Sequence, residues 1–161
     1  MTTGIFIRDY VESDVEAVVA IAKDLQHHEL KIDARLKPID AIGQSYIDVL
    51  RADVKKSDGR FIVAEYGGAV AGYCTLLTHC DSGGEVDEMF YRYSFVSDFG
   101  VLENMRSKGI GKALLEECEK AVRAAGIKYL RLAVMAENAG ARKFYARAGF
   151  GEMRLRLEKK L

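Results

Sequence analysis

The chain has 161 residues, an ordinary length for one domain, and its 24 Lys and Arg residues balance its 24 Asp and Glu residues. The zero formal net charge excludes a general electrostatic attraction to nucleic acid or to a lipid surface, so an anion-binding site has to be local. No apolar stretch approaches the roughly 20 residues that a membrane span requires. We therefore expect a single cytoplasmic domain over residues 1–161, without a nucleic-acid or membrane partner.

Apolar periodicity divides the first half of the chain into a strand, two helices and a hairpin. Period-two alternation predicts strands, and apolar residues at three- and four-residue intervals predict helices. The expected elements are, in chain order, a strand at 5–10, a helix from Ser13 or Asp14 through Leu25, a loop at 27–38, a helix at about 39–54, and strands at 61–66 and 69–80. Gly67 and Gly68 join the two strands and tolerate the positive φ angles of a tight hairpin turn.

The second half alternates strands with helices. After a polar loop at 81–88, the expected elements are a strand at 91–102, a helix with its apolar stripe from Leu114 to Ala125, a strand at 127–134, a helix from Asn138 to about Ala148, and a last strand at 150–158. Ser97 interrupts the apolar face of its strand, and Gly100 weakens that strand, so we expect a bulge there. The order β-α-α-β-β-β-α-β-α-β predicts an α/β (α+β) fold, with a mixed, largely antiparallel sheet flanked by helices.

The cysteines are Cys74, Cys80 and Cys118. Their number is odd, and no two of them are close enough in sequence for a CxxC metal or redox motif. We expect free thiols in a reducing compartment, and we expect no metal site.

The stretch RSKGIGK, residues 106–112, lies between a strand and a helix. Its two glycines leave backbone N–H groups uncovered and the helix dipole favours negative charge, so the turn predicts an anion site. A Walker phosphate loop is excluded because Ala113 follows the Gly-Lys pair where Ser or Thr is needed. A dinucleotide fingerprint is excluded because Leu114 stands where a third glycine is needed.

The stretch VLENMRSKGIGKALL resembles the acyl-CoA loop of the GNAT superfamily of acetyl-CoA-dependent N-acetyltransferases, with Arg106, Gly109 and Gly111 at the signature positions. The stretch ENAGARKFYARAGF resembles the second C-terminal motif of that family through Asn138 and Tyr145. The resemblance is close from residue 93 to residue 150 and implies a GNAT-like single domain. It also implies acetyl transfer from acetyl-CoA to a primary amine, by direct attack in a ternary complex.

The resemblance assigns the cosubstrate to the glycine turn and to the strand before it. Main-chain groups of Phe99 and Val101 are expected to bind the pantetheine arm, and Asn138 is expected to contact the arm from the other side. The turn is expected to bind the pyrophosphate through its N–H groups and to supply positive charge there or at the 3′-phosphate. Its residues are Arg106, Ser107, Lys108, Gly109, Ile110, Gly111 and Lys112. Lys108 and Lys112 can equally be solvated surface charges.

The resemblance also places catalytic groups. Tyr145 matches the family tyrosine that faces the CoA sulfur and acts as the general acid, the alternative being a core tyrosine. The amide of Phe99, where the strand is expected to bulge, is the candidate oxyanion donor. Many family members place a Glu where this chain has Ser97, so Asp98 acting through water is the first candidate base and Glu65 the second.

The acceptor is expected to be an amine of a small molecule or peptide, and the sequence does not specify it. His27 and His28 can line the acceptor side or be exposed, while acids and aromatic rings suit a cationic amine. The candidates of this second kind are Asp87, Glu88, Tyr91 and Tyr93. A homodimer can form through the sheet edges. The alternative to an acetyltransferase is a catalytically idle CoA-binding or sensing domain, because Ser97 stands where many family members have a Glu.

Overall fold

The structure is a computed structural model that describes residues 4–84 and 92–161. Over these residues, five strands form one sheet in the order β1-β2-β3-β4-β5. The strands are β1 Ile5–Asp9, β2 Arg60–Tyr66, β3 Ala69–Asp81, β4 Arg92–Val101 and β5 Leu130–Leu132. The first four pair antiparallel and β5 is parallel to β4. The predicted mixed, largely antiparallel sheet is confirmed.

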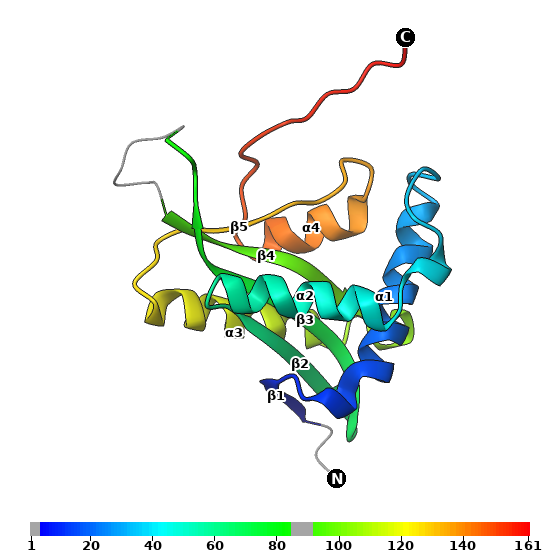
Figure 1. Cartoon of the computed structure of the whole chain (residues 1–161), viewed down its shortest axis with the longest axis vertical. Coiled ribbons are helices and arrows are strands. Elements are labelled where there is room, and N and C mark those ends of the chain that lie inside the picture. Colours follow the sequence, from blue (N-terminus) through cyan, green and yellow to red (C-terminus); the bar gives the residue numbers. More distant parts are fainter. Residues whose placement is uncertain (1–3, 85–91) are drawn as a thin grey trace.

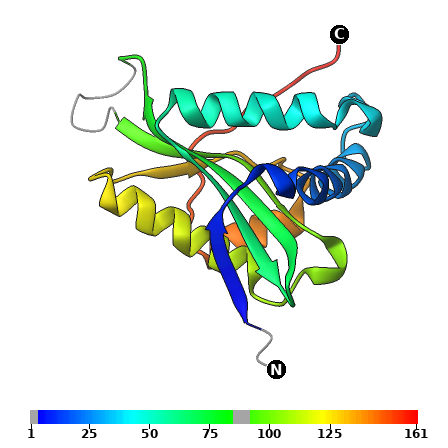
Figure 2. The ribbon, with the colours of Figure 1, turned by 60° about the horizontal axis from the view of Figure 1, so that its bottom comes forward.

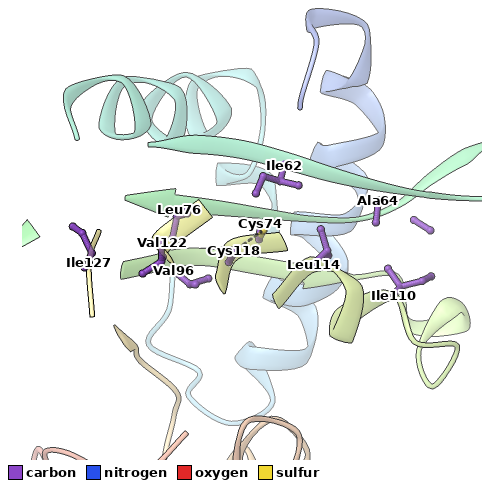
Figure 3. Packing of buried hydrophobic residues seen from close by; sticks show 11 residues of the cluster. Ile62, Ala64, Cys74, Leu76, Val96, Ile110, Leu114, Cys118, Val122 and Ile127 are labelled. Atoms are coloured by element: carbon purple, nitrogen blue, oxygen red, sulfur yellow. Dashed lines mark hydrogen bonds between the residues drawn. The ribbon is translucent and has the colours of Figure 1, made fainter. Parts of the chain in front are cut away.

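Helices lie on both faces of the sheet (Figures 1 and 2). They are α1 Val15–Leu30, α2 Gln44–Lys56, α3 Ile110–Ala124 and α4 Ala139–Arg147. On one face, α1 and α2 contribute Ile21 and Ile47 to a core with Tyr73 of β3. On the other face, α3 contributes Leu114 and Cys118 to a second core, shown in Figure 3. Amphipathic helices bury their apolar stripes against the sheet, and the two cores are the result.

The first two helices differ from the sequence prediction at their ends. Helix α1 continues to Leu30, so His27 and His28 lie in its last turns and the expected loop at 27–38 was wrong over its first residues. No Gly or Pro interrupts this stretch, so backbone preference favours continuation of the helix. Helix α2 begins at Gln44, because Gly43 before it is extended at φ −159° and residues 39–41 form a separate 3-10 turn.

Strand β4 contains the predicted bulge. Thr75 of β3 is opposite Asp98, whereas the next residue, Leu76, is opposite Val96. Ser97 is therefore the extra residue on β4. The hairpin turn is also confirmed, since Gly67 and Gly68 have φ values of 62° and 83°.

The predicted last strand was wrong. Residues 150–161, all of them described, belong to no strand or helix. Strand β5 is also shorter than the expected 127–134. The alternating apolar residues of the C-terminal segment are present, but an alternating pattern forms a strand only where a neighbouring strand supplies hydrogen bonds. Among the described residues, no helix has the length and apolar character needed to cross a membrane.

Candidate active site

The site begins where β4 and β5 stop pairing. The parallel pairs run from Ser94 opposite Leu130 to Val96 opposite Leu132. Within the described chain, no pair joins the two strands beyond Val96, and the bulge at Ser97 follows at once. The rest of β4 therefore has main-chain groups on its β5 side that the sheet does not use.

The register of β3 and β4 shows which residues present these groups. The amide of Leu102 donates to the carbonyl of Ala71 at 3.0 Å, so Gly72 and Val101 are a non-hydrogen-bonded antiparallel pair. By alternation, the main-chain groups of Phe99 and Val101 point away from β3. These are the two residues to which the family resemblance assigns the pantetheine arm.

Side chains from nearby contact both of these main-chain groups. The Phe99 amide donates to Oδ1 of Asp98 at 2.9 Å. The Val101 carbonyl accepts a hydrogen bond from Nε of Arg106 at 3.3 Å. A ligand that binds this edge of β4 has to displace both contacts.

The glycine turn lies directly before α3. Ser107 and Gly109 have positive φ values of 63° and 87°, and Gly109 is the N-cap of α3. The amide of Ala113 donates to the carbonyl of Gly109 at 3.0 Å, so the amides of the preceding turn lie before the first hydrogen-bonded turn of the helix. Amides in this position, at the positive end of the helix dipole, are of the kind that can bind an anion.

Gly111 allows α4 to approach the first turn of α3. A Cβ atom at this position would lie 3.1 Å from Cζ of Phe144 and 3.6 Å from Cζ of Phe99. The aromatic rings of β4 and α4 therefore pack on the turn itself. This contact brings the turn, the free edge of β4 and helix α4 together.

The three cations of the turn are exposed. Arg106 bonds the Val101 carbonyl, as described above. Lys108 places Nζ 5.1 Å from the centre of the Tyr66 ring. Nζ of Lys112 lies 3.7 Å from a carboxylate oxygen of Glu116 on the same helix. Exposed contacts of this kind are weak, so they leave these side chains able to move.

Tyr145 lies in an aromatic cluster on α4. Its ring centroid is 5.2 Å from that of Phe144, 5.9 Å from that of Phe150 and 6.1 Å from that of Phe99. Burial, together with the negative charge of Asp98, raises the pKa of Tyr145 to about 12. The phenol is therefore protonated at neutral pH and can donate a proton.

Asn138 begins helix α4, as predicted. Its Oδ1 atom accepts a hydrogen bond from the amide of Ala141 at 3.1 Å, which is an N-cap interaction. Because Oδ1 serves the helix, a contact between Asn138 and a bound ligand has to come from its Nδ2 group.

Asp98 is 9% exposed, and its side chain lies on the α1–α2 side of the sheet. Its Oδ2 atom accepts hydrogen bonds from the hydroxyl of Tyr73 at 3.0 Å and from the hydroxyl of Tyr46. Burial raises the pKa of Asp98, although the hydrogen bonds from Tyr46, Tyr73 and the Phe99 amide oppose the increase. A carboxylate with a raised pKa is a better proton acceptor than an exposed one.

A second carboxylate, Glu29, influences the same region from the last turn of α1. Burial and the negative charge of Asp98 raise the pKa of Glu29, whereas nearby His28 lowers it. The charges of Glu29 and Asp98 also raise the pKa of Tyr145. Two acidic groups on the α1–α2 side therefore give this side of the site a negative potential.

The second candidate base and the candidate acceptor contacts lie away from Asp98 and Tyr145 or outside the described residues. Glu65 forms an ion pair with Arg8 at 2.7 Å and lies on β2, with β3 between it and β4. The guanidinium of Arg131 lies 4.0 Å above the ring of Tyr93. His27 is exposed. Asp87, Glu88 and Tyr91 lie outside the described residues.

Sequence reasoning missed Tyr46, Tyr73 and Glu29. The two tyrosines occupy core-facing positions of a helix and a strand, where a phenol needs a hydrogen-bond partner. This requirement was the signal in the sequence that could have pointed to the two tyrosines. Their common partner, Asp98, lies 52 residues from Tyr46 and 25 residues from Tyr73, and sequence periodicity does not reveal contacts at such separations.

The cysteines are free thiols. Sγ of Cys74 and Sγ of Cys118 lie 3.4 Å apart in the α3-side core. Across residues 4–84 and 92–161, no three His, Cys, Asp or Glu side chains are grouped so that they could hold a metal ion.

The acetyltransferase (GNAT) family model matches residues 19–150. Because this match covers most of the chain, the protein belongs to the acetyltransferase (GNAT) family. It is 43% identical over 68 residues to the uncharacterized N-acetyltransferase YycN of Bacillus subtilis (strain 168). That match spans 42% of this chain and 44% of YycN, so the chain matches less than half of this relative.

Solved structures share the fold over nearly the whole chain. A mutant BH1408 protein from Bacillus halodurans has a TM-score of 0.84 at 19% identity, and the match covers 97% of this chain and 99% of that one. A GCN5-related N-acetyltransferase from Ralstonia eutropha JMP134 has a TM-score of 0.73 at 19% identity, with 98% and 99% covered. AAC(6')-Iy, in complex with the bisubstrate analogue CoA-S-monomethyl-acetylneamine, has a TM-score of 0.73 at 18% identity, with the same coverage.

Proposed function

We propose that the protein transfers the acetyl group of acetyl-CoA to a primary amine of a small molecule or protein, by direct attack in a ternary complex. One observation carries the proposal. The main-chain groups of Phe99 and Val101 that the sheet leaves unpaired lie beside the glycine turn, with Asp98 on one side and Tyr145 on the other. An extended acyl-thioester arm needs such an edge, and its pyrophosphate needs such a turn.

In this proposal the amides of residues 107–111 bind the pyrophosphate. Arg106 releases the Val101 carbonyl so that the pantetheine arm can bond to it, and Nδ2 of Asn138 contacts the arm from α4. Lys108 and Lys112 are free to supply charge because their present contacts are exposed and weak. In this proposal the turn therefore selects the acetyl donor, acetyl-CoA.

The chemistry requires a neutral amine, a donor to the oxyanion and a proton for the leaving sulfur. The Phe99 amide donates to the oxyanion, which takes the place of Oδ1 of Asp98. The displaced carboxylate of Asp98 removes a proton from the ammonium group of the acceptor, directly or through water, and the neutral amine then attacks the thioester carbon. As the oxyanion returns to a carbonyl and the carbon–sulfur bond breaks, Tyr145 donates its phenolic proton to the leaving sulfur. The nitrogen of the new amide loses its extra proton, which restores the phenol of Tyr145.

The acceptor side faces α1 and α2. Asp98 and Glu29 supply negative charge there, and the ring of Tyr46 lies beside them, which favours a cationic amine. AAC(6')-Iy, which shares the fold, is in complex with the bisubstrate analogue CoA-S-monomethyl-acetylneamine, and this is compatible with an amine acceptor.

The test combines acetyl-CoA binding with thiol release. We expect calorimetry to detect acetyl-CoA binding, and we expect release of free thiol with at least one member of a panel of polyamines, amino acids, aminoglycosides and peptides. Binding without release on every amine would favour the idle CoA-binding alternative, for which Ser97 in place of a strand Glu is the supporting feature. Absence of binding would reject both functions.

A further inference from the structure

A single 3-10 turn, Glu103–Met105, joins β4 to the glycine turn. Val101, to which the pantetheine arm is assigned, precedes this 3-10 turn, and the amides of residues 107–111 follow it. Hydrogen bonds in 3-10 turns have poor geometry, and the bond from the Arg106 amide to the Glu103 carbonyl is 3.3 Å long. The position of the turn therefore depends on contacts with the rest of the fold.

One such contact comes from Asp24 of helix α1. Its Oδ2 atom accepts a hydrogen bond from the Glu103 amide at 2.7 Å, although the two residues are 79 positions apart. The first amide of a helical turn has no partner inside the turn, so a carboxylate at this place acts as a cap. The distance is typical of a hydrogen bond to an ionised acceptor, which is stronger than a neutral one.

Helix α1 also contacts the end of β4 on the other side of Val101. A Cβ atom on Gly100 would lie 2.9 Å from Cγ2 of Ile21, so glycine allows α1 to approach the strand closely there. Ile21 and Asp24 are three residues apart and lie on the same face of α1. Helix α1 thus contacts the chain directly before and directly after Val101, and Figures 1 and 2 show the connection from β4 to α3 beside this helix.

We propose that Asp24 is a positioning residue for the cosubstrate. By capping the 3-10 turn, it holds the Val101 carbonyl and the amides of residues 107–111 at the spacing that the pantetheine arm and the pyrophosphate require. Asp24 acts through the Glu103 amide and does not touch the ligand. The inference rests on the proposed function, because it concerns the same CoA site, and it makes α1 a support of the donor site as well as a wall of the acceptor side.

The charge of Asp24 allows a positioning role to be told from an electrostatic one. The pyrophosphate is an anion, so a nearby carboxylate repels it, and removal of the carboxylate would by charge alone strengthen acetyl-CoA binding. Loss of the cap has the opposite effect, because the turn is then no longer held. Asp24→Ala removes both the charge and the cap, whereas Asp24→Asn removes the charge and retains an oxygen that can accept from the Glu103 amide.

The test measures acetyl-CoA affinity by calorimetry. We expect Asp24→Ala to bind about tenfold more weakly than the native chain, as loss of one hydrogen bond to a charged group predicts, and Asp24→Asn to retain near-native affinity. Asp24→Leu, which fills the space of the carboxylate without an acceptor, is measured in parallel and should bind as weakly as Asp24→Ala. In steady-state rates, the loss should appear as a higher KM for acetyl-CoA, with kcat largely retained at saturation.

Gln26→Ala is the matched control. It removes another hydrogen bond from α1 to a distant main-chain group, since Nε2 of Gln26 donates to the Lys37 carbonyl at 2.6 Å, and it should leave acetyl-CoA affinity unchanged. If the native chain binds acetyl-CoA and Asp24→Ala binds it as tightly or more tightly, the positioning role is overturned and the proposed function stands. Equal weakening in Asp24→Asn or in Gln26→Ala also overturns it. A native chain that does not bind acetyl-CoA overturns both.

Discussion

Asp98 is the residue whose environment most clearly predicts a pH-dependent role. Burial raises its pKa, so the carboxylate forms at higher pH than an exposed aspartate would, and the rate should rise as pH increases through that raised value. We expect Asp98→Asn to lower kcat by about 10²- to 10⁴-fold and to remove this rising limb, with acetyl-CoA affinity unchanged. Steady-state rates across pH, at saturating acetyl-CoA, measure both effects.

Tyr46 offers a control that retains the carboxylate. Its hydroxyl donates to Oδ2 of Asp98 and so stabilises the charged form. Tyr46→Phe removes this donor and should raise the pKa of Asp98 further, which shifts the rising limb to higher pH without abolishing it. If the rising limb of the pH–rate profile has the same position in both variants as in the native protein, Asp98 is not the base.

Tyr145 should contribute to turnover rather than to binding. With its pKa raised to about 12, the phenol remains protonated across the working pH range. We expect Tyr145→Phe to lower kcat by about 10²-fold or more, with little change in the calorimetric affinity for acetyl-CoA. Tyr10→Phe is the control, since the Tyr10 hydroxyl is buried with no hydrogen-bond partner in the described part of the chain, and its loss should leave kcat unchanged.

The two ends of helix α3 each have a glycine with a positive φ angle. Substituting each glycine in turn separates loss of ligand binding from loss of stability caused by backbone strain. Gly109 before the helix and Gly126 after it have positive φ values of 87° and 71°, so Ala at either position costs roughly 1–2 kcal/mol of stability. Only Gly109 belongs to the proposed pyrophosphate turn. We expect both variants to be destabilised by similar amounts in urea, but only Gly109→Ala to bind acetyl-CoA more weakly by calorimetry. Equal affinities would contradict the placement of the pyrophosphate.

Elements with local causes could be predicted from the sequence. The hairpin depends on Gly67 and Gly68, and the α4 cap depends on Asn138, whose partner is three residues away. The bulge at Ser97 was predictable because a polar residue breaks an alternating face. The glycine turn before α3 is likewise a local pattern, and it was found together with its neighbouring strand and helix.

The parts that sequence reasoning missed depend on distant partners. The hydrogen bonds of Asp98 with Tyr46 and Tyr73 join two strands and a helix across the fold, and no short window contains them. The C-terminal segment shows the opposite case. Its alternation predicted a strand, but residues 150–161 belong to no strand, because a strand depends on hydrogen bonds with a neighbouring strand as well as on its own sequence.

For the whole molecule, β4 connects two halves with different roles. Alternate residues of a strand face opposite sides of its sheet. Phe99 packs with the α3-side core, next to the turn proposed to bind the cosubstrate, whereas Asp98 contacts Tyr73 of the α1–α2-side core. Donor and acceptor can therefore approach from different faces and meet at the edge of β4 beyond Val96, where β5 no longer pairs.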